Sequence, residues 1–165
     1  RDCLLSRGLG DVYKRQENTP AIAGMTAALR EAVDHMDGNM RKVTRLRETL
    51  ITGLETIAHA RLNGERTQRV PGTVNFCFEG IEGESLLLLL DRKGIAASSG
   101  SACTSGSLDP SHVLTAIGLT RDEAKGSLRL TLGTDTTQAD IDEVVKKLPG
   151  IVASLREMTS WCGRG

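Results

Sequence analysis

The apolar positions in the first third of the chain recur with the period of an α-helix. From Thr19 onward they fall mostly three or four residues apart, which places them on one helix face. These positions are Ile22, Met25, Leu29, Val33, Met40, Val43, Leu46, Leu50, Leu54 and Ile57. Pro20 is tolerated in a first helical turn that Thr19 can cap. The pattern predicts a long helical segment over residues 17–58 that Gly38 bends or interrupts. Such a helix is typical of a bridge between two domains, and a two-helix hairpin layer is the alternative.

Two later stretches alternate between apolar and polar positions, which is the period of a strand with one buried face. In PGTVNFCFEG, the side chains facing one way are Val74, Phe76 and Phe78, and those facing the other way are Asn75 and Cys77. In GSLRLTLG, the corresponding sets are Leu128, Leu130 and Leu132 against Arg129 and Thr131. We expect Cys77 to be a packed, structural thiol. A further strand is expected to begin at residues 95–97 and to lead into a loop.

Capping residues mark short helices between these strands. EGESLLLLLDRKG predicts a short buried helix that stops at Gly94. Asp109 with Pro110 after it is typical of a helix start. Thr120 and Glu123 fit a capping box for one more short helix.

The last helix is predicted to start at Thr137, with Asp140 in its first turn. Pro149 is expected to kink this helix or to start a second segment. About three strands with helices packed on one face make an α/β two-layer sandwich, which is the predicted fold class.

Composition and charge narrow the class of protein. The chain has 165 residues, of which 39% are hydrophobic, enough for a domain with a core. Acidic and basic residues number 21 each and aromatic residues make up 2%, so no nucleic-acid partner is expected. No apolar run approaches the roughly 20 residues that span a membrane. The four cysteines have no metal-ligand spacing, and free thiols favour a reducing, cytoplasmic compartment.

Cys103 lies in a run of glycine, serine, alanine and threonine, GIAASSGSACTSGSLDP. A reactive cysteine needs partial exposure and a neighbouring base, cation or helix N-terminus. The predicted helix start six residues later and the backbone N–H groups of the loop could favour the thiolate. Gly100 and Gly106 would let the segment move between two places. The alternative is a polar loop that contains an incidental cysteine.

Arg129 stands in the middle of a strand, on the face opposite three leucines. A guanidinium held there can bind a carboxylate with two hydrogen bonds; the alternative is a solvated surface residue. His112 is expected on a helix surface, and His35 and His59 are expected to be structural. Asn18 is most simply part of a helix cap.

Residues 98–114, SSGSACTSGSLDPSHVL, resemble the active-site loop of NifS/IscS-type cysteine desulfurases with the longer loop. Three more segments resemble the family in order and spacing. They are ENTPAIAGMTAALREAV, PGTVNFCFEGIEGESLLLLLDRKGIAASSGSAC and GSLRLTLGTDTTQADIDEVV. The resemblance covers about residues 17–158. It implies the small C-terminal domain of a fold-type I, aminotransferase class V enzyme, here over residues 59–160.

The resemblance also implies an activity. Such enzymes are homodimers that depend on pyridoxal 5′-phosphate and convert L-cysteine to L-alanine. Their loop cysteine becomes a persulfide and passes its sulfur to an iron–sulfur scaffold or another acceptor protein. Carried over residue by residue, Cys103 is the nucleophile, Arg129 holds the substrate carboxylate, and Asn18 lines the substrate site.

The resemblance is to the C-terminal part of the family alone. The family's cofactor lysine follows a Ser-x-His context that none of the histidines here provides, so no cofactor-binding residues are expected, and the chain alone is expected to be inactive. The cysteine spacing likewise predicts no metal-binding residues. Residues 1–16, with DVYKRQ where the family has Arg-x-Gly-Thr, are expected to be a non-native or disordered leader. The alternative function is a stand-alone sulfur-relay or scaffold-docking domain without the cofactor.

Overall fold

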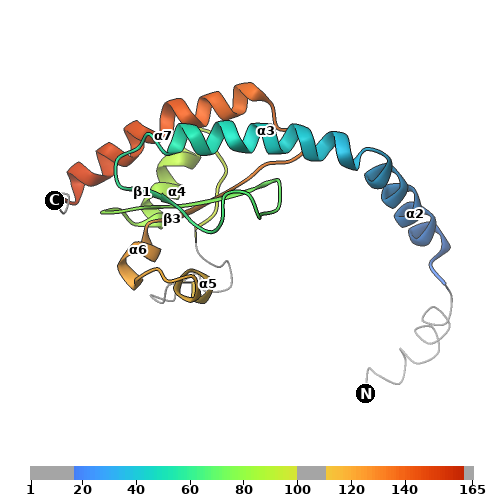
Figure 1. Ribbon diagram of the computed structural model, residues 1–165, viewed down its shortest axis with the longest axis horizontal. Helices are drawn as coiled ribbons and strands as arrows, with labels where there is room; N and C mark the ends of the chain where they lie inside the picture. Colours follow the sequence, from blue (N-terminus) through green and yellow to red (C-terminus); the bar gives the residue numbers. More distant parts are fainter. Residues whose placement is uncertain (1–16, 100–110, 162–165) are drawn as a thin grey trace, which may run out of the picture. The chain divides into compact units, whose positions relative to one another are not determined.

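The computed structural model describes residues 17–99 and 111–161 (Figure 1). The chain divides into two compact units, residues 1–38 and 39–165. Helix α2, Thr19–Asp34, belongs to the first unit, and helix α3, Met36–Leu54, crosses from the first into the second. The other helices and strands of the described ranges belong to the second unit. None of the helices in the described ranges is long and apolar enough to cross a membrane.

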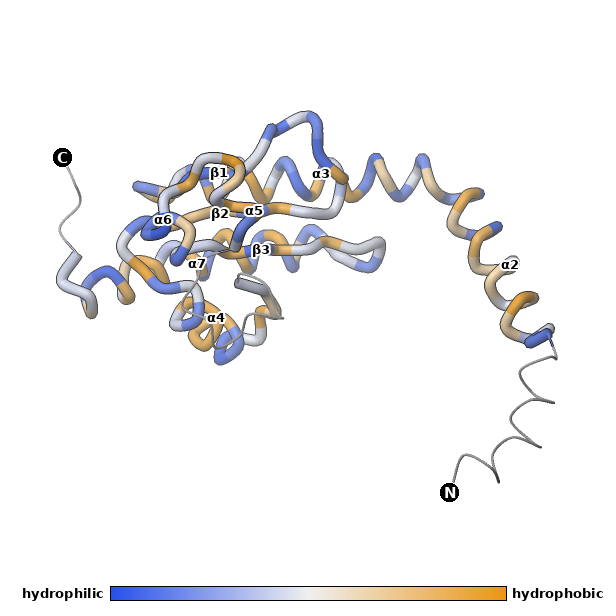
Figure 2. Tube along the Cα trace, turned by 90° about the horizontal axis from the view of Figure 1, so that it is seen from below, coloured by the Kyte–Doolittle hydropathy of each residue, from blue (hydrophilic) through white to orange (hydrophobic). Residues whose placement is uncertain are grey.

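Helix α2 begins and ends at residues that bond its terminal backbone groups. Asn18 is its N-cap, and the Asn18 side-chain oxygen accepts a hydrogen bond from the Ala21 backbone N–H (3.1 Å). None of its residues is buried, so the apolar residues of the predicted stripe are exposed; Figure 2 marks apolar positions along α2 in orange. The interruption of the long helix lies at His35, and the prediction that it lies at Gly38 was wrong. His35 is the C-cap of α2: its backbone N–H donates to the Glu31 carbonyl (3.1 Å), and its ring Nδ1 lies 2.9 Å from the same oxygen.

The sheet has three antiparallel strands in the order β1–β2–β3. They are β1 (Ala60–Leu62), β2 (Thr73–Phe78) and β3 (Ser127–Thr131). The predictions of β2 and β3 are confirmed. Strand β1 escaped prediction because three residues are too short to show an alternating pattern. The strand expected at residues 95–97 is not formed; that segment reaches the sheet only through a single bridge between Ser98 and Arg129.

One face of the sheet carries the main core. Val74, Phe76 and Phe78 of β2 are at most 1% exposed and pack with Leu128 and Leu130 of β3. Three helices cover this face: α3, α4 (Gly83–Asp91) and α7 (Gln138–Met158). They contribute mainly leucine and isoleucine; the fully buried members are Leu46, Leu50, Ile51, Leu54, Leu86, Leu90, Leu148 and Val152. This arrangement is the predicted α/β two-layer sandwich.

The helix ends in this layer follow the predicted signals. Gly94 has φ +76° and its backbone N–H bonds the Asp91 carbonyl (2.8 Å), so it ends α4 as predicted. Thr137 and Asp140 form a capping box at the start of α7. Helix α7 continues through Pro149 to Met158 without a second start. The missing N–H of Pro149 removes one hydrogen bond, and burial of its neighbours Leu148, Ile151 and Val152 holds the helix together.

The opposite face of the sheet is covered at one end by two short helices, α5 (His112–Ala116) and α6 (Arg121–Lys125). A second apolar cluster forms there from Cys77, Leu114, Leu119 and Ala124. The prediction of helices on one face was therefore incomplete, because buried Cys77 gives these helices an apolar point of contact. The capping box of Thr120 and Glu123 is confirmed. Asp109 and Pro110 lie outside the described residues, and the described part of α5 follows Ser111.

Replacing Gly126 with alanine is expected to lower the free energy of unfolding by about 2 kcal/mol. A Cβ at Gly126 would collide with the Phe78 carbonyl oxygen and lie 3.2 Å from the Ile81 carbonyl oxygen. The Phe78 N–H also donates to the Gly126 carbonyl (3.0 Å), so neither backbone can move freely. Urea denaturation measures the change. Gly133→Ala is the matched control, because a Cβ there meets nothing within 4 Å; equal losses in the two variants would contradict the packing argument.

Candidate functional site

Four polar residues form a row across the sheet, on the face opposite the main core. Asn75 of β2 pairs with Arg129 of β3, and Arg129 pairs on its other side with Ser98. On its other edge, β2 pairs with β1, and Asn63 directly after β1 continues this pairing opposite Asn75. The Asn63 backbone N–H donates to the Asn75 carbonyl (2.9 Å). We call Asn63, Asn75, Arg129 and Ser98 the polar row. It joins four segments of the chain: the residue after β1, strand β2, strand β3 and the segment at Ser98.

The pairing brings the Asn75 and Arg129 side chains close together. Backbone hydrogen bonds join Leu132 to Gly72 (2.7 Å) and Phe78 to Gly126 (3.0 Å). Because bonded pairs alternate along an antiparallel ladder, Asn75 and Arg129 form a non-hydrogen-bonded pair. Side chains are nearest in such pairs, with Cβ atoms about 5 Å apart. The two side chains therefore share one patch of the open face.

The Arg129 backbone is fixed on both sides while its side chain is exposed. The Arg129 N–H donates to the Ser98 carbonyl (2.7 Å), and the Ser98 N–H donates to the Arg129 carbonyl (3.0 Å). Within residues 17–99 and 111–161, no carboxylate forms an ion pair with the Arg129 guanidinium. A guanidinium held in this way can bind a carboxylate with two parallel hydrogen bonds.

Asn63 holds the other end of the polar row. It is 6% exposed, and its Nδ2 donates to the Asn75 Oδ1 (2.6 Å) and to the Cys77 Sγ (3.1 Å). Its backbone carbonyl accepts a hydrogen bond from Arg69 (2.9 Å). The Asn63 Oδ1 is a buried oxygen that has no hydrogen-bond partner in the described part of the chain. Both hydrogens of the Asn63 amide are thus used to orient its neighbours.

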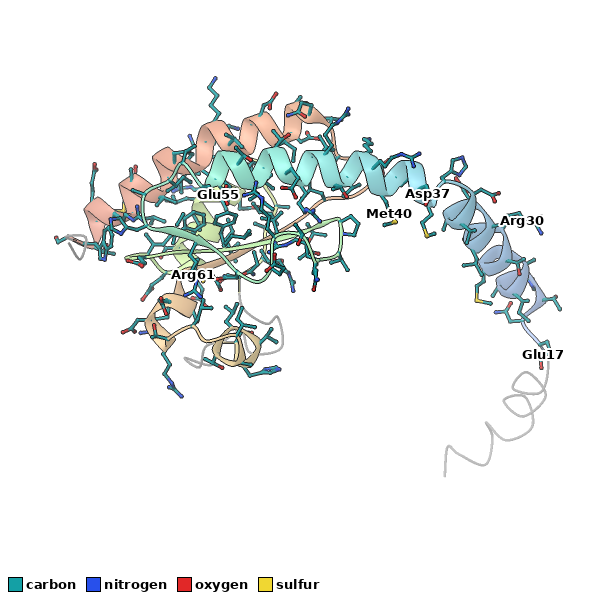
Figure 3. All side chains as sticks on the ribbon, viewed as in Figure 1. Glu17, Arg30, Asp37, Met40, Glu55 and Arg61 are labelled. Carbon is teal, nitrogen blue, oxygen red and sulfur yellow. The ribbon has the colours of Figure 1, made fainter. Side chains whose placement is uncertain are left out.

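Cys77 is a buried free thiol beneath this row, as the sequence predicts. Burial raises the pKa of the Cys77 thiol, and the hydrogen bond from Asn63 opposes that rise in part. The neutral thiol is therefore favoured, and neutral thiols are poor nucleophiles. Arg61 of β1 extends to the α6 side of the sheet, beside the cluster around Cys77 (Figure 3). The Arg61 Nη1 lies 3.6 Å from the Glu123 Oε1.

The three predicted site residues fall in different parts of the chain. Arg129 lies in the polar row, in the second unit. Asn18 lies in the first unit, where its side chain caps α2. Cys103 lies outside the described residues. Asn75, Asn63 and Ser98 are members of the row that sequence patterns did not single out. The available signal was a polar residue at the centre of each of two paired strands, Asn75 and Arg129.

The three histidines lie at helix ends or against an aromatic ring. His112 is exposed at the start of α5, and His35 ends α2. His59 has φ +54° and packs edge-on against Trp161, with ring centroids 5.0 Å apart. In the ranges that the structure describes, no three His, Cys, Asp or Glu side chains are grouped to hold a metal ion.

The described lysines do not suit a cofactor that is bound as a Schiff base, which needs a desolvated, unpaired amine. Lys42 donates to the Thr134 carbonyl (2.6 Å), and Lys125 pairs with Asp122 (2.9 Å). Lys147 pairs with Glu143, and Lys93 and Lys146 are exposed. In residues 17–99 and 111–161, the lysine amines are thus either paired or exposed to solvent.

Comparisons with known proteins agree on one family. The aminotransferase class-V profile matches residues 7–144. The cysteine desulfurase IscS of Methanosarcina thermophila is 48% identical over 160 residues, which is 96% of this chain and 40% of that protein. The cysteine desulfurase NifS of Azotobacter vinelandii is 45% identical over 151 residues, or 90% of this chain and 38% of that protein.

The solved structures agree with the sequence relatives. A NifS-like protein from Rickettsia africae superimposes with a TM-score of 0.72 and 28% identity, over 84% of this chain and 36% of that protein. The chain thus spans about 40% of the length of the curated relatives it matches.

Proposed function

Because the chain belongs to the aminotransferase class-V family and to its NifS/IscS cysteine desulfurases, we propose that it forms the part of a cysteine desulfurase that binds the substrate carboxylate and carries its sulfur. The complete enzyme converts L-cysteine to L-alanine. Relatives named as desulfurases favour this activity over a stand-alone sulfur relay.

The bridge between Ser98 and Arg129 is the observation that carries the proposal. Cys103 lies five residues after Ser98 in the sequence. Since each residue spans at most about 3.6 Å, the Cys103 Cα lies within about 18 Å of that of Ser98. A thiol on this tether can reach a cysteine whose carboxylate is held by Arg129. The same bridge gives the tether a fixed origin next to the arginine.

Each residue has a separate role in the proposed reaction. Arg129 binds the carboxylate and orients the substrate. The Cys103 thiolate attacks the substrate sulfur, so that an S–S bond forms as the C–S bond of the substrate breaks. The electron pair of the broken C–S bond stays with carbon. Protonation of that carbon yields alanine, and the sulfur remains on Cys103 as a persulfide. Asn18 is proposed to be a further residue of the substrate site.

Other parts of the proposal concern the complete protein. Pyridoxal 5′-phosphate is the family's electron sink, and we propose that residues outside the described ones hold it. An iron–sulfur scaffold or another acceptor protein takes the sulfur. The complete enzyme is proposed to be a cytoplasmic homodimer.

A hybrid enzyme tests the proposed function. In it, this chain replaces the matching segment of the IscS of Methanosarcina thermophila. We expect the purified, cofactor-loaded hybrid to release equal amounts of sulfide and alanine from L-cysteine in the presence of a reductant. A folded, cofactor-loaded hybrid that releases neither product would contradict the proposal. Omission of L-cysteine is the blank, and unmodified IscS is the positive control.

A further inference from the structure

The polar row points to a second residue that acts on the substrate carboxylate. We propose that Asn75 is a specificity-determining residue whose side-chain amide donates a hydrogen bond to the carboxylate held by Arg129. This inference rests on the proposed function, because it assumes that Arg129 binds that group. The Asn75 amide would be a second hydrogen-bond donor to the carboxylate, on the strand next to that of Arg129.

The orientation of the Asn75 side chain is set by Asn63. The Asn75 Oδ1 accepts a hydrogen bond from the Asn63 Nδ2 at 2.6 Å. Asn63 is itself 6% exposed and is tied to Asn75 and Arg69 through its backbone. The Asn75 oxygen is therefore committed to the β1 side. Its Nδ2, with two hydrogens, is left for another acceptor.

The side chains of Asn75 and Arg129 both carry hydrogen-bond donors that can bind an anion. Their side chains are neighbours in a non-hydrogen-bonded pair on the open face. Both present donors there, and in the described ranges neither the Asn75 Nδ2 nor the Arg129 guanidinium has an acceptor. Two donors side by side suit the two oxygens of one carboxylate, and a charge-assisted bond from an amide is shorter and stronger than a neutral one.

The isosteric change Asn75→Asp separates this role from a structural one. Aspartate keeps the oxygen that Asn63 needs and replaces the donor with a second oxygen. In the hybrid enzyme we expect KM for L-cysteine to rise on the order of tenfold, with kcat within about twofold. Inhibition by L-alanine should weaken by the same factor, whereas inhibition by L-alaninamide, which has no carboxylate, should not weaken.

Three further variants make the result decisive. Thr73→Val changes the same strand face outside the polar row, and KM should stay unchanged.

Asn75→Thr removes the amide without adding charge and should raise KM to a smaller extent. This variant carries the test if Asn75→Asp fails to fold, as judged by thermal unfolding. An unchanged KM in a folded Asn75 variant, or equal weakening for L-alanine and its amide, would overturn the inference. If Arg129→Ala also leaves KM unchanged, the role proposed for Arg129 fails instead.

Discussion

Replacing Cys103 with alanine in the hybrid enzyme will reduce sulfide release from L-cysteine by at least about 1000-fold. The sulfur of the substrate has to be transferred to a nucleophile for the C–S bond to break. Serine at this position should be equally inactive, since a hydroxyl is a far weaker nucleophile toward sulfur than a thiolate. The rate of sulfide release in the presence of a reductant measures the effect. The absorbance of the bound cofactor should stay intact, which shows that the variant is folded.

The buried thiol serves as an internal comparison for this prediction. Burial raises the pKa of Cys77, and its side chain is inaccessible. Treatment of the native hybrid with iodoacetamide should therefore inactivate it with alkylation of Cys103, while the peptide that contains Cys77 remains unmodified. Sulfide release that persists in Cys103→Ala would refute the nucleophile assignment. Inactivation that follows alkylation of Cys77 would refute the contrast between the two thiols.

Replacing Arg129 with alanine is expected to lower kcat/KM for L-cysteine on the order of 100-fold, mainly through KM. Hydrogen bonds to a charged group contribute about 1.5–3 kcal/mol each, and the guanidinium can form two of them with one carboxylate. The fold should be preserved, because the Arg129 side chain is exposed and forms no ion pair in the described part of the chain. Steady-state kinetics and a thermal unfolding curve measure the two effects.

Arg129→Lys provides the matched control. Lysine keeps the charge and loses the planar pair of donors, so we expect a KM between those of the wild type and Arg129→Ala. Thr131→Ala changes an exposed neighbour on the same face of β3 and should leave KM unchanged. Kinetics of Arg129→Ala that match the wild type would show that the carboxylate binds elsewhere.

The sequence by itself determined the local structure of this protein. Alternation of Val74, Phe76 and Phe78 with polar residues is enough to predict a half-buried strand, since side chains on a strand point alternately to its two faces. The capping box at Thr120 depends on residues three apart and was equally visible, as was the helix start at Thr137. The resemblance of the Cys103 loop gave the family, which the comparisons confirm.

Only the tertiary structure decided which segments pair with one another and which side chains this pairing brings together. Strand β1 and the bridge at Ser98 exist only through pairing with distant partners, and no local period marks so short a segment. Helix α2 ends at His35, where both the ring Nδ1 and the backbone N–H lie within bonding distance of the Glu31 carbonyl, whereas Gly38 is accommodated inside α3. The polar row is the clearest case. The register of three strands, which burial of one face fixes, brings Asn63, Asn75 and Arg129 together although up to 66 positions separate them in the sequence.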